Sequence, residues 1–181
     1  MNALAMLFPL RTGRLTIEPF SEVHLTSRYL AWLNDAEVVQ FSEQRHKQHT
    51  LTSCREYMLS FADSSDAFLA LVTRSEEARH IGNMTIAIDE QNSVADLSIL
   101  IGDSSMWGQG YATEAWTAVC HALLANGVRK ISAGTLASNT GMLKVMQRAG
   151  MVLDGHRRAH RLVNEQPVDV IYGALFANAP Q

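Results

Sequence analysis

The sequence lacks most of the features that would place it in a special class of protein. It has only two cysteines, Cys54 and Cys120, without the spacing of a metal site, so we expect reduced thiols in a cytoplasmic protein. A net charge of −3 gives no general attraction for nucleic acid. The apolar residues 1–10 carry no basic leader and are too short for a signal peptide or a membrane span. We therefore expect neither a nucleic-acid partner nor a membrane partner.

Internal repeats, low-complexity tracts and linkers rich in Pro, Gly or Ser are also missing. The 181 residues fit a single domain, and 47% hydrophobic with 18% charged residues is ordinary for a globular protein. We expect one domain over residues 11–176, preceded by an N-terminal extension at residues 1–10 and followed by a C-terminal tail at residues 177–181.

The hydrophobic patterning predicts seven strands and four helices. Alternation predicts strands over residues 14–20, 67–73, 81–88, 94–102, 129–135, 151–161 and 168–176. Helical spacing predicts helices over residues 22–33, 50–62, about 111–126 and 140–149. This order predicts an α/β (α+β) fold with a mixed, largely antiparallel sheet, in which only the segments flanking the helices run parallel.

The most informative stretch is the glycine-containing turn between the strand over residues 94–102 and the helix that follows. Gly108 and Gly110 allow the backbone to approach a ligand closely. Unpaired N–H groups at the positive end of a helix dipole attract phosphate, so the turn indicates a phosphate-bearing cofactor. The dinucleotide motif G-x-G-x-x-G does not fit because Thr113 replaces its third glycine, and the P-loop lysine is absent.

With these residues, the sequence resembles the GNAT superfamily of acetyl-CoA-dependent acetyltransferases. The superfamily signature Arg/Gln-x-x-Gly-x-Gly/Ala corresponds to Trp107-Gly108-Gln109-Gly110-Tyr111-Ala112, where Trp107 departs from the usual first residue. That departure fits the branch of ribosomal-protein N-terminal acetyltransferases. Further motifs of the branch are Leu15–Phe20, Ile81-Gly82-Asn83, Asn139 with Ala149-Gly150-Met151, and Gly155-x-x-Arg158 with Asp169 before Tyr172-Gly173. The resemblance extends over residues 11–176.

The resemblance implies acetyl-CoA as co-substrate, no metal, and a gap between two splayed parallel strands that receives the pantetheine arm. Backbone groups of residues 100–102 would pair with that arm, and the N–H groups of residues 108–113 would hold the pyrophosphate. The implied cofactor residues are Leu100, Ile101, Gly102, Trp107, Gly108, Gln109, Gly110, Tyr111, Ala112, Thr113 and Asn139. For Asn139 the alternative is a helix-capping role before Thr140.

Acetyl transfer to an amine also needs a proton acceptor and a proton donor. Asp96 stands where several family members carry a catalytic Glu, and it shares a strand face with Ser98. It would accept the proton directly or through water; the alternative is a solvated strand aspartate. Met142 and Met146 occupy the family's usual donor positions and cannot donate a proton. The alternative donors Tyr111, Ser98 and Tyr172 stay open.

Two segments bear on the acceptor. The basic strand over residues 156–161 is either a solvated sheet face with an Arg158–Asp169 cross-strand pair, or a clamp for an anionic substrate such as a nucleotide-linked amino sugar. Glu43 lies in the region that lines the acceptor cleft in the family, where it would hold a cationic amine; the alternative is a charged surface loop.

The sequence thus predicts an N-acetyltransferase that acts on a primary amine, as a monomer or homodimer. The branch resemblance favours a protein N-terminus as acceptor, with a nucleotide-linked amino sugar or another small amine as the alternative. A non-catalytic acetyl-CoA-binding module is the rival, because the usual donor hydroxyls are missing.

Overall fold

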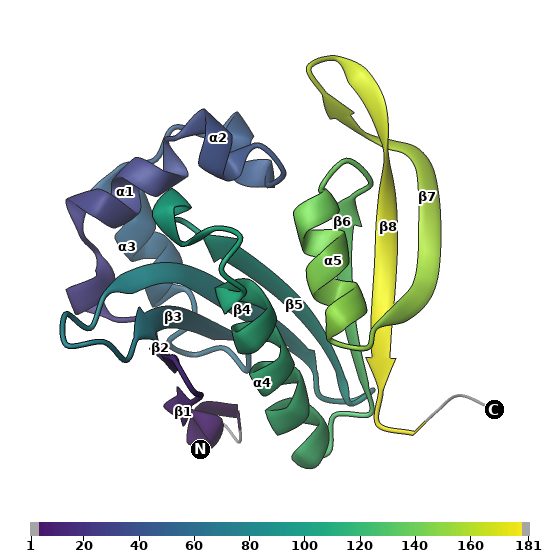
Figure 1. Cartoon of the computed structure of the whole chain (residues 1–181), viewed down its shortest axis with the longest axis horizontal. Coiled ribbons are helices and arrows are strands. Elements are labelled where there is room, and N and C mark those ends of the chain that lie inside the picture. Colours follow the sequence, from purple (N-terminus) through teal and green to yellow (C-terminus); the bar gives the residue numbers. More distant parts are fainter. Residues whose placement is uncertain (1–3, 179–181) are drawn as a thin grey trace.

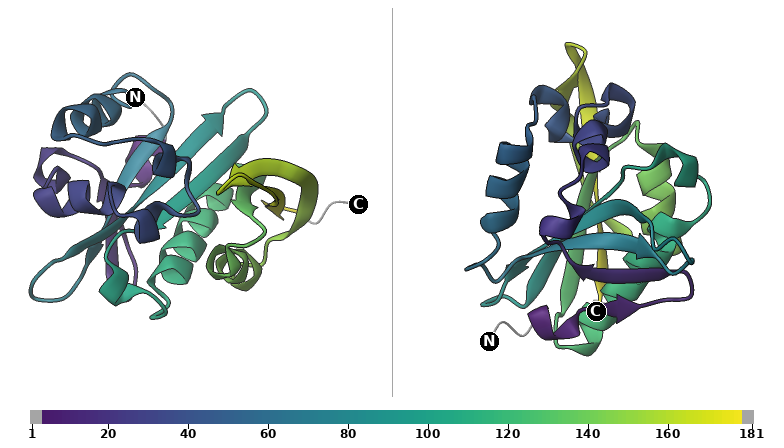
Figure 2. Two further views of the ribbon diagram at one scale, coloured as in Figure 1. Left: turned by 90° about the horizontal axis from the view of Figure 1, so that it is seen from above. Right: turned by 90° about the vertical axis from the view of Figure 1, so that its left-hand side faces the viewer.

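The computed structural model describes residues 4–178, which form one sheet with helices on both faces (Figures 1 and 2). The strands are β1 (Leu10–Arg11), β2 (Leu15–Pro19), β3 (Ala67–Thr73), β4 (His80–Asp89), β5 (Val94–Ile101), β6 (Lys130–Leu136), β7 (Val152–Val163) and β8 (Gln166–Phe176). The α-helices are α1 (Ser27–Leu33), α2 (Ala36–Val39), α3 (Leu51–Leu59), α4 (Tyr111–Ala125) and α5 (Thr140–Arg148). Four short 3₁₀ turns complete the described part: η1 (Leu4–Leu7), η2 (Glu22–His24), η3 (Glu43–His46) and η4 (Ser104–Met106).

The sheet order is β1-β2-β3-β4-β5-β6-β8-β7, and only β5 and β6 pair in parallel. The expected mixed, largely antiparallel sheet is confirmed, but it has eight strands rather than seven. The additional strand, β1, has two residues and pairs with Thr16 and Ile17 of β2. It spans the boundary expected between the N-terminal extension and the domain, and Leu4 and Phe8 of that extension are also buried in the core. Of the expected tail at residues 177–181, residues 179–181 lie outside the described residues.

Two faces of the sheet are buried, and side chains of β3 alternate between them. Leu69 and Leu71 join the core under α4 and α5, which includes Trp116 and Val119. Phe68 and Ala70 face α1 and α3 on the opposite side, where Trp32 and Cys54 are buried. Figure 2 shows the two groups of helices on opposite faces of the sheet. Within residues 4–178, the structure has no helix long and apolar enough to cross a membrane.

The helix expected over residues 22–33 is instead a short turn, η2, followed by α1. Leu25 has a non-helical backbone (φ −75°, ψ 68°), and the Thr26 hydroxyl accepts a hydrogen bond from the Tyr29 N–H at 3.1 Å. Thr26 therefore starts a new helix. After the expected break at residues 34–35, Asp35 caps a further helical turn, α2, that the pattern did not indicate. The addition of α2 raises the number of α-helices from about four to five.

Candidate active site

The site begins where β5 and β6 part. Their parallel pairing joins Val94 with Lys130, Ala95 with Ile131 and Asp96 with Ser132, and in the described chain it ends there. On its other edge, β5 stays paired with β4 as far as Ile101. The expected gap between splayed parallel strands is therefore present, with Asp96 at its base. Backbone groups of β5 beyond Asp96 are available on the β6 side for an amide-containing chain.

Gly102, at the open end of β5, is closed off from the α1 side. A Cβ atom on Gly102 would stand 2.1 Å from the nearest ring atom of Trp32, so the indole lies directly against this glycine. The indole of Trp107 donates a hydrogen bond to the Ile101 carbonyl at 2.7 Å. Two tryptophans thus fix the end of β5 and the start of the glycine turn.

The turn itself presents backbone N–H groups to open space. Gly108 (φ 73°) and Gly110 (φ 84°) both have left-handed backbones, which favour glycine. The Glu114 N–H donates to the Gly110 carbonyl at 3.0 Å and starts the ladder of α4, so the N–H groups of the preceding turn lie outside that ladder. A Cβ on Gly108 would have nothing within 4 Å. A seat of this shape fits a diphosphate, as the sequence predicts.

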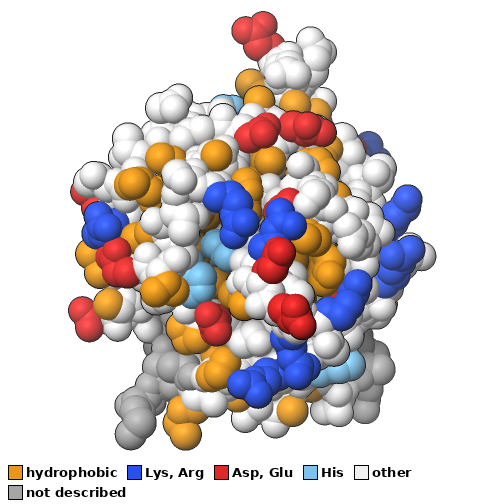
Figure 3. All heavy atoms as spheres, turned by 60° about the vertical axis from the view of Figure 1, so that its left-hand side comes forward, with side chains coloured by type: hydrophobic (Ala, Val, Ile, Leu, Met, Phe, Trp, Pro, Cys, Tyr) orange, Lys and Arg blue, Asp and Glu red, His pale blue; other side chains and the backbone are white. Residues whose placement is uncertain are grey.

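A cavity of about 1050 Å³ lies on the α3 side of the sheet and reaches into the gap between β5 and β6. Its floor carries Asp96, Ser98 and Leu100 of β5, with Gly134 and Thr135 of β6 beside them. Side chains from η3, α3 and the β7–β8 hairpin form its walls. The charged side chains of the lining have mixed signs, with Glu43, Glu56 and Asp96 against Lys47 and Arg161. Figure 3 shows that acidic and basic side chains are also interspersed on the face that comes forward when the left-hand side of Figure 1 is turned toward the viewer.

Asp96 and Ser98 lie side by side on the cavity floor. The Ser132 hydroxyl donates to Oδ2 of Asp96 at 2.8 Å, and Ser98 shares a hydrogen bond of 2.5 Å with Thr85. Burial raises the pKa of Asp96, and the hydrogen bond from Ser132 offsets part of that rise. A carboxylate with a raised pKa is a stronger base than an ordinary aspartate.

The structure narrows the list of proton donors. Met142 lines the cavity and Met146 is buried, so neither position of α5 supplies a hydroxyl. Tyr111 lies away from the cavity, beneath the guanidinium of Arg14. Tyr172 of β8 does line the cavity: its ring covers Gly134, where a Cβ would stand 2.7 Å from the ring. Ser98 and Tyr172 are therefore the predicted donors that the cavity brings together with Asp96.

Asn139 uses both ends of its side chain within the protein. Its Oδ1 accepts from the Met142 N–H at 3.1 Å and caps α5, and its Nδ2 donates to the Thr135 hydroxyl at 3.1 Å. The residue also lines the cavity. The capping role is thus present, and the cofactor role stays a prediction.

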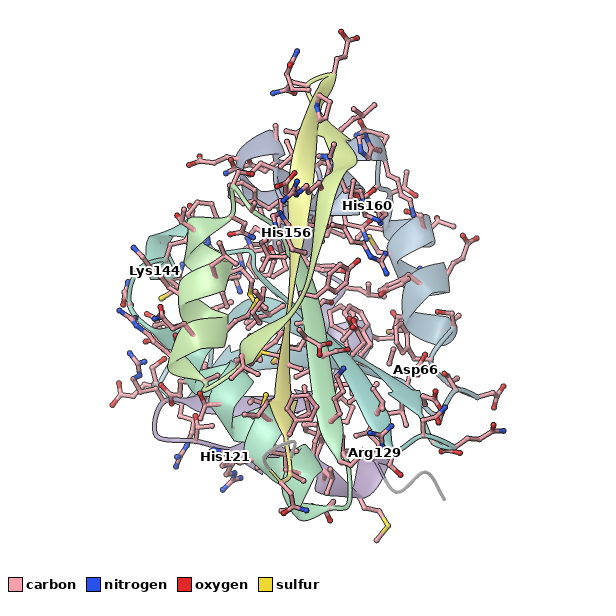
Figure 4. The ribbon with its side chains drawn as sticks, turned by 90° about the vertical axis from the view of Figure 1, so that its right-hand side faces the viewer. Asp66, His121, Arg129, Lys144, His156 and His160 are labelled. Atoms are coloured by element: carbon pink, nitrogen blue, oxygen red, sulfur yellow. The ribbon has the colours of Figure 1, made fainter. Side chains whose placement is uncertain are left out.

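The basic strand places different residues at the cavity than expected. The expected Arg158–Asp169 pair is wrong, because a bulge in β7 between Arg157 and Arg161 shifts the register. Asp169 instead pairs with His156 at 2.6 Å and accepts the Ala159 N–H at 2.8 Å. Figure 4 shows His160 on the side of the hairpin that faces α3.

Arg161, rather than Arg158, lines the cavity, and its guanidinium lies 3.9 Å from the carboxylate of Glu43. Glu43 lines the cavity as predicted and also pairs with Arg45 at 3.1 Å. Arg45 donates to the Ser42 carbonyl at 2.7 Å and to the Leu162 carbonyl at 3.3 Å. The η3 segment and the β7–β8 hairpin therefore contact each other, and together they form one wall of the cavity.

Several further residues of the site, Arg14, His49 and Tyr57 among them, were not predicted from the sequence. Arg14 reaches the glycine turn from the N-terminal side of β2, and His49 and Tyr57 line the cavity from the start and the middle of the α3 segment. Burial, and then the charge of Lys47, lower the pKa of His49. Only the tertiary fold brings these side chains to the site, because no spacing in the sequence connects them to the glycine turn.

Comparisons with known proteins agree with this geometry. The model of the acetyltransferase (GNAT) domain family matches residues 14–152. RimL, a ribosomal L7/L12 α-N-protein acetyltransferase solved with coenzyme A, has a TM-score of 0.82 at 18% identity, covering 93% of this chain and 97% of that one. Spermidine N-acetyltransferase from Vibrio cholerae, solved with CoA and spermine, has a TM-score of 0.81 at 15% identity (92% and 97% covered). Ribosomal-protein-S5-alanine acetyltransferase from Vibrio fischeri has a TM-score of 0.80 at 15% identity (94% and 97% covered).

Among the curated proteins, none matches the chain significantly. The structural relatives share the fold at low identity, whereas the family model covers most of the chain, including the splayed strands and the glycine turn. The chain belongs to the GNAT family and is an acetyl-CoA-dependent N-acetyltransferase.

Proposed function

We propose that the acceptor is the α-amine of a protein N-terminus, and that the enzyme works in the cytoplasm. The observation that carries this proposal is the single carboxylate, Asp96, at the base of the gap, within a cavity whose other charges have mixed signs. An α-amine has a pKa near 8, about two units below that of a lysine or polyamine nitrogen. It therefore loses its proton with the help of one weak base.

The walls of the cavity argue against a polycationic acceptor. Glu43 and Glu56 line it, but Lys47 and Arg161 line it too, and Glu43 is already paired with Arg45. A polyamine with two or more positive charges would need a clear excess of carboxylates, and the described lining has an excess of only one when Asp96 is counted. A peptide carries one charge at its terminus and amides beyond it, and these suit a lining of mixed charge.

In the proposed mechanism, bound acetyl-CoA supplies the acetyl group as a thioester, whose carbonyl carbon forms a bond to the amine nitrogen as the C–S bond breaks. Asp96 accepts the proton that the amine loses, directly or through water. Tyr172 donates a proton to the departing thiolate from the opposite wall. N–H groups of β5 beyond Asp96 stabilise the negative charge that develops on the carbonyl oxygen. The unpaired backbone groups of the gap thus both orient the thioester and polarise its carbonyl group.

The test is an acceptor panel in which release of free CoA is measured with unblocked peptides, N-terminally blocked peptides that contain lysine, spermidine and amino-sugar nucleotides. We expect turnover with unblocked peptides and a loss of at least tenfold in kcat/KM when the α-amine is blocked. Turnover with spermidine or an amino-sugar nucleotide, and none with any peptide, would contradict the proposal.

One observation favours a second acceptor. Lys47 and Arg161 stand on the cavity lining, and a pair of cations suits the phosphates of a nucleotide-linked amino sugar. The same panel distinguishes the two acceptors when it is repeated with Arg161→Gln. This variant should raise the KM for an amino-sugar nucleotide severalfold and leave the KM for a peptide without acidic groups unchanged.

The non-catalytic alternative rests on Met142 and Met146. It predicts that acetyl-CoA stabilises the fold while no acceptor in the panel is acetylated. The presence of Tyr172 and Ser98 in the cavity argues for catalysis, because each supplies a hydroxyl that the two methionines lack.

A further inference from the structure

The glycine turn provides dipoles and N–H groups but no cation of its own. None of the residues from Trp107 to Thr113 is positively charged. The two polar side chains at its start are directed inward: Trp107 donates to the Ile101 carbonyl, and Gln109 donates to the Ser105 carbonyl at 2.6 Å. A diphosphate brings two negative charges to the turn. The countercharge must therefore come from elsewhere in the chain.

Arg14, from the segment before β2, is held against the turn by three separate contacts. Its Nε donates to Oε2 of Glu114 at 2.7 Å, and its Nη1 donates to the Gln109 carbonyl at 3.0 Å. Its guanidinium carbon lies 4.2 Å from the centre of the Tyr111 ring. These contacts fix the guanidinium along the first turn of α4.

The third nitrogen, Nη2, lies beside Gly110 of the glycine turn. It lies 3.6 Å from the position that a Cβ on Gly110 would take. Within residues 4–178, no hydrogen bond of Nη2 to a protein atom accompanies those of Nε and Nη1. Arg14 also lines a cavity of about 380 Å³, together with Arg74, Glu77 and Arg79 among others. A guanidinium donor that is held in a fixed position beside the glycine turn suits a phosphate oxygen.

Glu114 holds the Arg14 guanidinium in this position through Nε, and not through Nη2. Its Oε1 accepts from the Thr12 hydroxyl at 2.6 Å and from the Arg14 N–H at 2.7 Å. Burial opposes ionisation of Glu114, but these hydrogen bonds outweigh it and lower the pKa of the carboxyl. Glu114 is thus ionised near neutral pH and keeps the guanidinium plane in one orientation.

We propose that Arg14 is the charged residue that binds the diphosphate of acetyl-CoA, through Nη2, and that Glu114 is its positioning residue. The inference concerns the cofactor alone, so it stands or falls independently of the proposed acceptor. It assigns to the N-terminal segment a direct part in a site whose other residues lie after position 95.

The experiment measures binding by calorimetry, without any acceptor, for Arg14→Gln and Arg14→Lys. The probes are CoA, dephospho-CoA, which lacks the 3′-phosphate, and pantetheine, which lacks all phosphates. Arg55→Gln is the matched control, because it also removes one positive charge and a guanidinium–carboxylate pair, with Glu22 at 2.8 Å, on the exposed surface. Circular dichroism and the melting temperature verify that each variant is folded.

We expect Arg14→Gln to weaken the binding of CoA and dephospho-CoA equally, by about tenfold, as for the loss of one charge-assisted hydrogen bond. Arg14→Lys should weaken binding by about half of this effect on a logarithmic scale. Lysine keeps the positive charge but lacks the planar guanidinium whose several N–H groups have fixed directions. Pantetheine binding and the Arg55→Gln variant should be unchanged. Equal weakening of pantetheine would assign Arg14 a structural role only, weakening of CoA alone would assign it to the 3′-phosphate, and unchanged affinities would leave it no role; each outcome overturns the proposal.

Discussion

Asp96 occupies the one position in this sheet where a carboxylate meets both the cofactor gap and the acceptor cavity. It is the last residue of β5 that pairs with β6, so its side chain marks the point where the strands separate. The Ser132 hydroxyl fixes one of its oxygens and leaves the other for a proton. In the proposed mechanism, this environment lets an aspartate take the place of the glutamate that the family resemblance implies.

Asp96→Asn should lower kcat by about 100-fold, because the amide has no basic oxygen to accept the amine proton. The affinity for CoA, measured by calorimetry, should stay within twofold of that of the native protein, which separates loss of a base from loss of the cofactor. Ser132→Ala is the control, since it removes only the hydrogen-bond donor. Full activity of Asp96→Asn at neutral pH would remove Asp96 from the mechanism.

Gly110→Val tests whether the glycine turn is a ligand seat or only a structural turn. A branched side chain at φ 84° is strained, and it also projects toward the proposed phosphate position. Gly127→Val is a matched control at the far end of α4, where φ is 92° and a Cβ would have nothing within 4 Å. Both variants carry the same backbone strain, and only Gly110→Val should weaken CoA binding, by tenfold or more. Equal affinities of the two variants would show that the turn does not touch the cofactor.

At the scale of elements, hydrophobic patterning located those that are long and regular. The strand predicted over residues 67–73 coincides with β3, because β3 buries both faces and its apolar run stands out. The helix after the glycine turn, α4, and the next helix, α5, were also located to within one or two residues. The pattern missed β1 and α2, since two and four residues are too few to establish a period. It merged η2 with α1 because the cap at Thr26 lies within a continuous apolar spacing.

Asn139 caps α5 and also lines the cavity, and two variants distinguish a role in the helix from a role in cofactor binding. Asn139→Ala removes the cap of α5 and should cost about 1 kcal/mol of unfolding free energy in urea denaturation. Asn139→Asp keeps the capping oxygen and loses the Nδ2 donor, so it should retain most of that stability. If the amide also contacts pantetheine, both variants bind CoA more weakly; if only Asn139→Ala does, the residue acts through the helix alone.

At the scale of the whole molecule, the layer of helices that borders the acceptor cavity is anchored by a buried pair of histidines. The rings of His24 and His80 lie 5.1 Å apart, edge to face, among Phe20, Tyr29 and Trp32. Burial, followed by the neighbouring His24, lowers the pKa of His80 to about 4, while a hydrogen bond to the Gly82 carbonyl opposes the change. Burial likewise lowers the pKa of His24, against the attraction of Glu18. Both rings are therefore neutral in the folded protein at neutral pH.

This pair predicts a loss of stability in mild acid. Because the folded pKa of His80 lies below the unfolded value near 6.5, the unfolded chain binds more protons between pH 6.5 and 4. Stability should be complete above pH 6.5 and fall as the pH approaches 4, by up to about 3 kcal/mol from His80. His80→Gln keeps a donor for Gly82 and cannot titrate. Urea unfolding of this variant should show a shallower fall between pH 7 and 4.5; an unchanged slope would assign the acid sensitivity to other groups.

The cofactor half of the site was predictable and the acceptor half was not, for a physical reason. Residues 94–113 form one continuous strand–turn–helix unit, so their spacing alone places one edge of the gap next to the glycine turn. The acceptor cavity is assembled from η3, α3 and a hairpin more than 100 residues further along the chain. Whether Arg158 or Arg161 faces it depends on a bulge in β7 that no periodicity indicates.

The short parallel contact between β5 and β6 has a mechanical consequence. Three residue pairs join the two parts of the sheet, whereas β5 has eight pairs with β4 and β6 has seven with β8. An amide chain lying in the opening would add hydrogen bonds between β5 and β6 across this short seam. Loading the enzyme with acetyl-CoA should therefore slow deuterium exchange in β6 and β8, which lie beyond the ligand, as well as in β5. The empty enzyme would flex along this seam, and each catalytic cycle would stiffen and release it in turn.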